Sequence, residues 1–227
     1  MLLLNGREVP LLFVHNPRAR RYVLRVRPDG SARLTVPRRG SIVGARQFAE
    51  RHKAWLQRQL HYFSERPARS TEWTVGTEIL FRGIPVKIQA DAIGLPGSIR
   101  FATESLRVAD PSANLRPPVE RHLRALATAE LPARTLEFAS HHRLSVRRVT
   151  VRNQKSRWGS CSPRGAISLN WRLIQTPPFV CDYIILHELM HLRQMNHSER
   201  FWREVQSVCP GYGAAKRWLT DHPRLLH

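Results

Sequence analysis

The feature that most constrains the fold is a strongly apolar stretch, residues 179–192, that nevertheless contains two histidines and a glutamate. These polar residues form the run His187-Glu188-Leu189-Met190-His191, which matches the pattern H-E-x-x-H. A stretch that is apolar nearly all round predicts a buried helix, and buried polar side chains are costly unless they have partners. Because residues four apart share one helix face, both imidazoles can bind a single zinc ion, which would supply the missing partner.

A tetrahedral catalytic zinc site needs a third protein ligand and leaves one position open. His197 is the best candidate, and it can reach the metal only if the helix ends within a few residues. We expect Asn196 to end the helix in a left-handed conformation, because asparagine often takes the place of glycine there. Glu199 and Glu204 are the alternative third ligands.

The residues beside these ligands suggest supporting roles. Glu188 lies next to the histidines and is the predicted general base acting on water at the metal. Ser198 is expected to cap a further helix, in which Phe201 and Trp202 would pack over the metal helix. The two aromatic residues could instead line a substrate pocket.

The chain is also very basic, and the charge is concentrated in two blocks. Among 227 residues, 37 are Lys or Arg and 17 are Asp or Glu, which gives a formal net charge of +20. Residues 1–70 hold 15 basic and 4 acidic groups, and residues 146–175 hold 7 basic and none that is acidic. Such a balance favours an anionic partner, usually nucleic acid. The region around the histidines is nearly neutral, so charge alone does not define the chemistry.

Composition excludes several classes of protein. No stretch approaches the roughly 18 consecutive apolar residues of a membrane helix, and the start lacks the features of a secretory signal. The three cysteines, Cys161, Cys181 and Cys209, are odd in number and widely spread, which argues against a disulfide scaffold. We therefore expect a cytoplasmic protein with no membrane partner.

The N-terminal region is predicted to be rich in β-structure. Alternating residues predict a hairpin over 20–36 with its turn at residues 27–30, and spacings of three and four predict an amphipathic helix over 41–63. Short strands are expected at 78–82, 84–89, 98–102 and 105–108. On the hairpin, period two places one set of arginines on an outward face that could contact phosphates: Arg21, Arg25, Arg27 and Arg33.

A turn-rich segment at 111–118 suggests a domain boundary, with residues 1–115 forming the N-terminal region and 116–227 the catalytic domain. Beyond it we expect a long helix over 119–141, bent at Pro132, and strands at 146–152 and 166–170 that flank a loop. The predicted fold class is α+β.

Several motifs of this sequence, taken in order, resemble the YgjP-like metal-dependent hydrolase family, relatives of the WLM and SprT-like zinc metallopeptidases. The resemblance covers about residues 15–220. It rests on Arg152-Asn153-Gln154-Lys155-Ser156-Arg157-Trp158-Gly159-Ser160-Cys161-Ser162, Ile167-Ser168-Leu169-Asn170-Trp171-Arg172-Leu173, His187-Glu188-Leu189-Met190-His191, Asn196-His197-Ser198 and Phe201-Trp202.

The resemblance implies a zincin-like domain, with a small mixed or antiparallel sheet over the metal helix. It implies that His187, His191 and His197 hold one zinc ion and that Glu188 is the base. In zincins an edge strand pairs with extended substrate, and Arg157–Asn170 is the candidate segment here. The residues expected to contact substrate are Arg157, Trp158, Gly159, Ser160, Asn170 and Tyr212.

Three functions compete on this basis. We expect a zinc metallopeptidase that acts on peptides or proteins. The same metal chemistry could hydrolyse a nucleotide phosphoanhydride, favoured by a basic block that includes Arg148, Arg152 and Lys155, although no phosphate-binding glycine loop is present. The basic surface could also recruit the enzyme to proteins bound to DNA or RNA, although no known nucleic-acid-binding signature appears.

Overall fold

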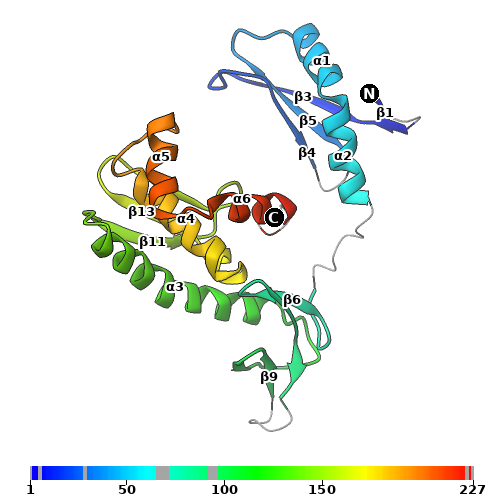
Figure 1. Cartoon of the computed structure of the whole chain (residues 1–227). Coiled ribbons are helices and arrows are strands. Elements are labelled where there is room, and N and C mark those ends of the chain that lie inside the picture. The colour runs from blue at the N-terminus through cyan, green and yellow to red at the C-terminus, as the bar shows by residue number, and fades with distance from the viewer. Residues whose placement is uncertain are drawn as a thin grey trace. The chain divides into compact units, whose positions relative to one another are not determined.

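The computed structural model of the chain describes residues 2–4, 7–27, 30–64, 72–91, 97–222 and 225. It forms two compact units, Met1–Thr71 and Glu72–His227, which Figure 1 shows in blue to cyan and in green to red. Each has a hydrophobic core of its own. The boundary expected after residue 115 falls inside the second unit, at the start of its first helix.

The first unit contains a three-stranded sheet of order β3-β5-β4, made of β3 (Leu11–Asn16), β4 (Val23–Val26) and β5 (Ala32–Pro37). Strands β4 and β5 form the predicted hairpin, although turn residues 28 and 29 lie outside the described part. Strand β3 runs parallel to β5. Strands β1 (Leu2–Leu4) and β2 (Arg7–Val9) form a separate antiparallel pair.

Two helices cover one face of this sheet, where a single helix was expected over 41–63. They are α1 (Ile42–Arg51), capped by the Ser41 hydroxyl, and α2 (Lys53–Ser64). The single-helix expectation is wrong at His52, whose φ of −104° and ψ of 17° interrupt the helix. Its ring nitrogen Nδ1 lies 2.8 Å from the carbonyl oxygen of Phe48, which also accepts from the His52 backbone N–H at 3.2 Å.

The second unit begins with short antiparallel strands, close to those expected. They are β6 (Glu78–Phe81) with β7 (Ile84–Lys87), and a sheet of order β10-β9-β8 from β8 (Gln89–Ala90), β9 (Ser98–Phe101) and β10 (Glu104–Arg107). Gly83, at φ +80°, lets the β6–β7 turn lie against Pro177, since a Cβ there would approach that ring to 2.4 Å.

The rest of the second unit surrounds one buried helix. The long helix α3 (Arg116–His141) continues through Pro132 and is followed by a sheet of order β11-β13-β12. This sheet contains β11 (Arg148–Arg152), β12 (Gly159–Cys161) and β13 (Ala166–Asn170), with β11 parallel and β12 antiparallel to β13. A 3₁₀ helix (Trp171–Gln175) then leads into α4 (Pro178–Met190), α5 (Glu199–Val208) and α6 (Tyr212–Asp221).

One continuous core explains why the strands before α3 belong to the second unit. Ile79 and Ile99 from those strands share a hydrophobic cluster with Leu123 of α3, Leu169 of β13 and Leu189 of α4. These side chains are almost completely buried, so the early strands complete the core around α4. In the described part of the chain, no helix is both long enough and apolar enough to cross a membrane.

Candidate metal centre

The apolar stretch forms the buried helix α4, as its composition predicted. His187 and His191 lie one turn apart on it, with ring centroids 5.1 Å apart. His191 is 7% exposed and stands where the helix ends, as its C-terminal cap. The helix therefore presents two imidazoles on one face.

The chain turns back immediately after α4, but not by the expected left-handed Asn196. Among the described residues that are not glycine, positive φ angles occur only at Arg82, Ala102 and Arg143. The helix instead ends in tight turns, where the backbone N–H groups of Leu192 and Arg193 donate to carbonyls three residues earlier. The Asn196 side-chain oxygen accepts from the Ser198 N–H, which leads the chain into α5.

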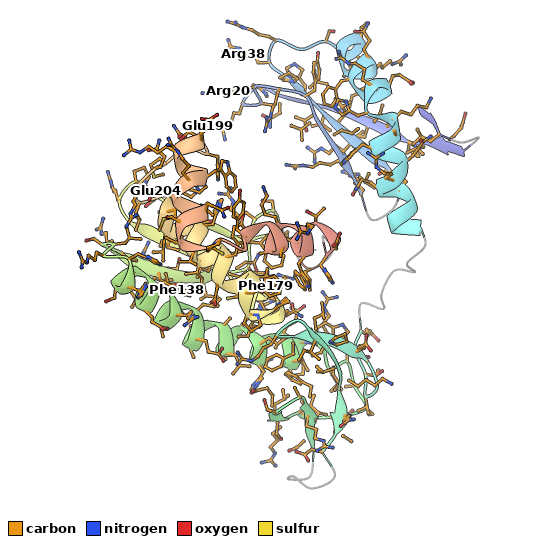
Figure 2. The ribbon with its side chains drawn as sticks, in the orientation of Figure 1. Arg20, Arg38, Phe138, Phe179, Glu199 and Glu204 are labelled. Atoms are coloured by element: carbon orange, nitrogen blue, oxygen red, sulfur yellow. The ribbon has the colours of Figure 1, made fainter. Side chains whose placement is uncertain are left out.

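This turn brings His197 to the two helix histidines. Its Nε2 lies 3.1 Å from the Nε2 of His187, and ligand nitrogens of the three residues all lie within 4.8 Å of one another. Glu199 and Glu204, the alternative third ligands, lie on α5 (Figure 2). They are absent from the metal-binding clusters found among the described residues, and Glu204 instead accepts from Arg193 at 2.8 Å.

The chemistry of this cluster fits a metal ion. Burial, followed by the charges of His191 and His197, lowers the pKa of His187 to about 3. The His187 imidazole is therefore neutral and has a lone pair to donate. The Nδ1 of His191 lies 3.1 Å from the carbonyl oxygen of Gln194, an arrangement that orients the ring of a metal-binding histidine by accepting its N–H. Three convergent imidazoles are a typical zinc ligand set.

Aromatic packing holds the three histidine rings in place. Phe201 of α5 is completely buried and its ring lies 4.5 to 4.9 Å from all three histidine rings. Trp202 is half-buried and its ring lies 5.8 Å from those of His187 and His197. Phe201 is thus the core residue that its sequence position predicted, while Trp202 forms part of a wall beside the cluster.

Glu188 is buried, and strand β12 lies directly against it. Burial raises the pKa of its carboxyl to about 7, although the positive charge of Arg157 acts in the opposite direction. A Cβ added at Gly159 would lie 2.6 Å from both the Cγ and Oε1 atoms of Glu188. Glycine at this position therefore lets the carboxylate pack against the strand.

The edge of the sheet that lies against α4 is β12, which pairs only with β13. Of the predicted edge segment, residues 159–161 form this edge strand and residues 166–170 the central strand. Ser160 is half-buried in β12, opposite Ser168. Trp158 precedes the strand, half-buried, and packs against the core, while Arg157 is exposed.

Asn170 is fully buried and holds the loop that precedes β12. Its amide donates to the carbonyl oxygens of Gln154 and Arg157 at 2.7 and 3.1 Å, while its side-chain oxygen accepts from the Arg172 N–H. This arrangement positions the loop and leaves no part of the side chain exposed to a substrate.

Replacing Asn170 with alanine should therefore destabilise the second unit. The two loop carbonyls would lose their donor, which typically costs about 1–3 kcal/mol in the free energy of unfolding. Urea denaturation of the wild type and of Asn170→Ala measures this cost. The replacement of exposed Asn153 is not a suitable control, because its side chain accepts from Trp171 and Arg172. Ser140→Ala on the exposed face of α3 is the matched surface change, and equal stability of the Asn170 and Ser140 variants would contradict the role given to Asn170.

Tyr212 belongs to a group of stacked aromatic rings beside the histidines, and the sequence predicted only part of this group. Its ring stacks with those of Tyr183 and Trp202, at centroid distances of 6.1 and 5.6 Å. The ammonium of Lys216 lies over the ring of Trp202, 4.6 Å from its centroid. Tyr183 was not predicted, although it precedes His187 by four residues and therefore had to share its helix face. Burial raises the pKa of Tyr183 to about 12, so its hydroxyl remains protonated.

The basic residues expected to contact anions lie elsewhere. Arg148 and Arg152 are exposed at the two ends of β11, the strand on the far side of β13 from β12. Lys155 is exposed in the loop that follows. None of the three is at the edge strand beside Glu188.

Taken together, the α+β fold and the histidine cluster define a zincin-like metallopeptidase. The comparison with protein families agrees, since the model of the YgjP-like metallopeptidase domain matches residues 20–222. The chain therefore belongs to the YgjP-like family.

The chain was also compared with curated proteins and with solved structures. A search of curated proteins gives no match. Among solved structures the chain is similar to the metallopeptidase zymogen abylysin of Pyrococcus abyssi, with 28% sequence identity over 41% of this chain and 95% of that one. The TM-score is 0.36, so the two structures superpose only in part.

Proposed function

We propose that this protein is a zinc-dependent peptidase that hydrolyses peptide bonds. In this proposal His187, His191 and His197 hold one zinc ion, and Glu188 is the general base. The observation that supports it best is the convergence of three imidazoles within 4.8 Å, with a buried carboxylate next to one of them on the same helix. Membership of a metallopeptidase family points to the same chemistry.

Zinc at this site would lower the pKa of a water molecule to about 7 and polarise the carbonyl group of the scissile bond. The chain itself has to move the protons. With its pKa raised to about 7 by burial, the Glu188 carboxyl is suited both to accept a proton from the attacking water and to donate it to the leaving amine. The exposed Arg157 side chain remains available as a donor to the substrate.

The substrate would bind in an extended conformation along β12. This short strand leaves one edge unpaired within the described sheet and packs against α4. Backbone hydrogen bonds from an edge strand hold a peptide largely independently of its sequence. The scissile bond would then lie beside Glu188, because Glu188 contacts Gly159 at the start of this strand.

Metal removal and restoration test this proposal. We expect the purified chain to cleave an unfolded protein or a peptide library, to lose this activity with a zinc chelator, and to regain it with about one equivalent of zinc. A panel of nucleoside triphosphates is assayed in parallel. Phosphate or pyrophosphate release without any peptide cleavage would contradict a peptidase and favour phosphoanhydride hydrolysis.

Gly159→Ala should lower the activity without unfolding the protein. The added methyl group would displace the Glu188 carboxylate, and misplacing a catalytic group by about 1 Å can cost about 100-fold in rate. The measurement is kcat on the same peptide, together with the melting temperature. Gly211→Ala is the matched control, because an added Cβ there meets no atom within 4 Å. Equal activity in both variants would contradict this placement of Glu188.

A further inference from the structure

The first unit contains a cavity of about 930 Å³. The topology of the sheet brings basic residues to its mouth. Because β3 and β5 are parallel, with Asn16 opposite Pro37, both strands end at the same edge of the sheet. The arginines that line the cavity follow these two ends: Arg18, Arg20 and Arg21 after β3, and Arg38 and Arg39 after β5.

Among the described residues, these five arginines have no acidic partner in or around the cavity. None of the residues that line the cavity is acidic, and within the described part of the chain none of the five forms a salt bridge. Helix α1 begins shortly after Arg39 in the chain, and its N-terminus adds the positive end of a helix dipole. Such a cluster attracts phosphate groups, which guanidinium groups bind with two parallel hydrogen bonds.

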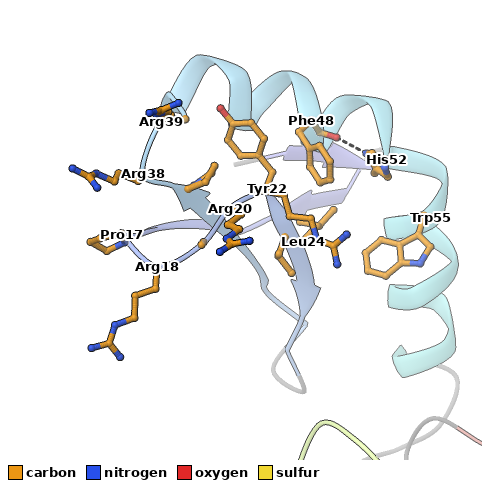
Figure 3. Close-up of a pocket in the computed structure, with 15 residues that line it drawn as sticks. Pro17, Arg18, Arg20, Tyr22, Leu24, Arg38, Arg39, Phe48, His52 and Trp55 are labelled. Atoms are coloured by element: carbon orange, nitrogen blue, oxygen red, sulfur yellow. Dashed lines mark hydrogen bonds between the residues drawn. The ribbon is translucent and has the colours of Figure 1, made fainter. Parts of the chain in front are cut away.

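The cavity continues from the arginines along a row of aromatic side chains, the aromatic wall. Figure 3 shows Phe48, His52 and Trp55 following one another along the helices and Tyr22, from the segment before β4, next to Phe48, with Arg18, Arg38 and Arg39 at one end. The ring centroids of Tyr22 and Phe48 are 5.7 Å apart, and those of Phe48 and His52 are 4.2 Å apart.

These aromatic side chains are only partly covered by the fold. Tyr22, Phe48 and Trp55 are half-buried, and His52 is exposed. Ring surface is therefore left for a ligand.

Tyr22, the aromatic side chain nearest the arginines, is held in place before any ligand binds. The hydroxyl of Tyr22 accepts from the backbone N–H of Ser41 at 2.9 Å and donates to the Ser41 carbonyl at 3.2 Å. Gly40 and Gly44 permit this approach, because a Cβ at either position would come within 2.8 Å of the hydroxyl oxygen. A side chain that is already ordered loses little entropy on binding.

We propose that this cavity binds single-stranded nucleic acid, with backbone phosphates on the arginines and unpaired bases on the aromatic wall. A basic groove interleaved with aromatic side chains is the arrangement that binds single strands without sequence preference. Its volume lies near the top of the range for ligand pockets, about 300–1000 Å³. In a duplex the bases are stacked on one another and unavailable to the wall. An acidic peptide would pair with the arginines but leave the aromatic rings without a partner.

This site differs from the arginine set predicted on the hairpin. Of that set only Arg21 lines the cavity. Arg25 of β4 and Arg33 of β5 lie opposite each other in the register of the two strands. Their side chains lie on the face of the sheet opposite to Ala32 and Leu34, which are buried beneath the helices. These two arginines therefore provide a control with the same change in charge outside the cavity.

Fluorescence anisotropy with labelled oligo(dT) and oligo(U) tests the proposal on the full chain. We expect binding to at least one of them, weakened about 10-fold or more between low and physiological salt. Arg38→Ala/Arg39→Ala and His52→Ala should each weaken binding at least fivefold. All three positions are exposed, and circular dichroism and the melting temperature check that each variant keeps the fold of the wild type.

The control variant Arg25→Ala/Arg33→Ala should bind nearly as well as the wild type. An equal loss in this control would overturn the proposal, because binding would then follow net charge alone. Equal affinity for a duplex of the same sequence, or equally strong competition by polyglutamate, would also overturn the proposal. The same holds if the chain binds free nucleoside triphosphate but not oligonucleotide, or if it binds no oligonucleotide at low salt. Peptidase activity is not part of this readout, so its outcome is independent of the function proposed above.

Discussion

Replacing Glu188 with glutamine should reduce peptide hydrolysis by about 10²–10⁴-fold, the usual contribution of a general base. Glutamine has nearly the same shape and fills the same buried space against Gly159, but it cannot accept a proton from water. It should also not destabilise the fold, because burial already disfavours the charged form of this carboxyl. The measurement is kcat on a defined peptide, with metal content and melting temperature determined on the same sample.

Retained zinc is the essential control for this variant. Glu188 lies outside the histidine cluster, so Glu188→Gln should bind as much zinc as the wild type. Inactivity with zinc retained would support the role of the base. Activity close to that of the wild type, in a variant that holds zinc, would refute the mechanism.

Replacing His197 with alanine should weaken zinc binding by more than about 100-fold, since loss of a residue that merely orients a ligand already costs 10–100-fold. The variant would leave only His187 and His191, too few ligands for a tetrahedral protein site. Because His197 is exposed, the fold should survive. Competition with a chromophoric chelator measures the affinity.

Three variants provide the comparison for His197→Ala. His141→Ala removes another exposed histidine, outside the cluster, and should bind zinc like the wild type. Glu199→Ala and Glu204→Ala remove the alternative third ligands. Unchanged zinc affinity in His197→Ala, together with a loss in either glutamate variant, would assign the third ligand to that carboxylate.

The sequence predicts those parts of the site that depend on local spacing. Two histidines four apart on an apolar helix had to share a face, and the structure places them on one buried helix. The sequence also predicted His197 as a ligand, because a catalytic zinc site needs a third protein ligand. The sequence did not predict the conformation of the turn between His191 and His197. The helix ends in tight turns stabilised by the Gln194 and Asn196 side chains rather than in a left-handed residue.

Features that depend on distant parts of the chain could not be read from spacing. The contact between Gly159 and Glu188 requires the packing of β12 on α4, which joins segments almost 30 residues apart. The arginine cluster of the first unit depends on the parallel pairing of β3 with β5, whereas the sequence favoured only the local hairpin. The break at His52 is a change in backbone dihedral angles that hydrophobic periodicity does not reveal.

The central claim is that His187, His191 and His197 together hold one zinc ion. Anomalous diffraction at the zinc absorption edge, from crystals of the protein purified with zinc, tests it most directly. The account predicts one strong peak enclosed by the nitrogens of these three imidazoles. A peak located elsewhere, or a zinc-loaded crystal with none among the three rings, would contradict it.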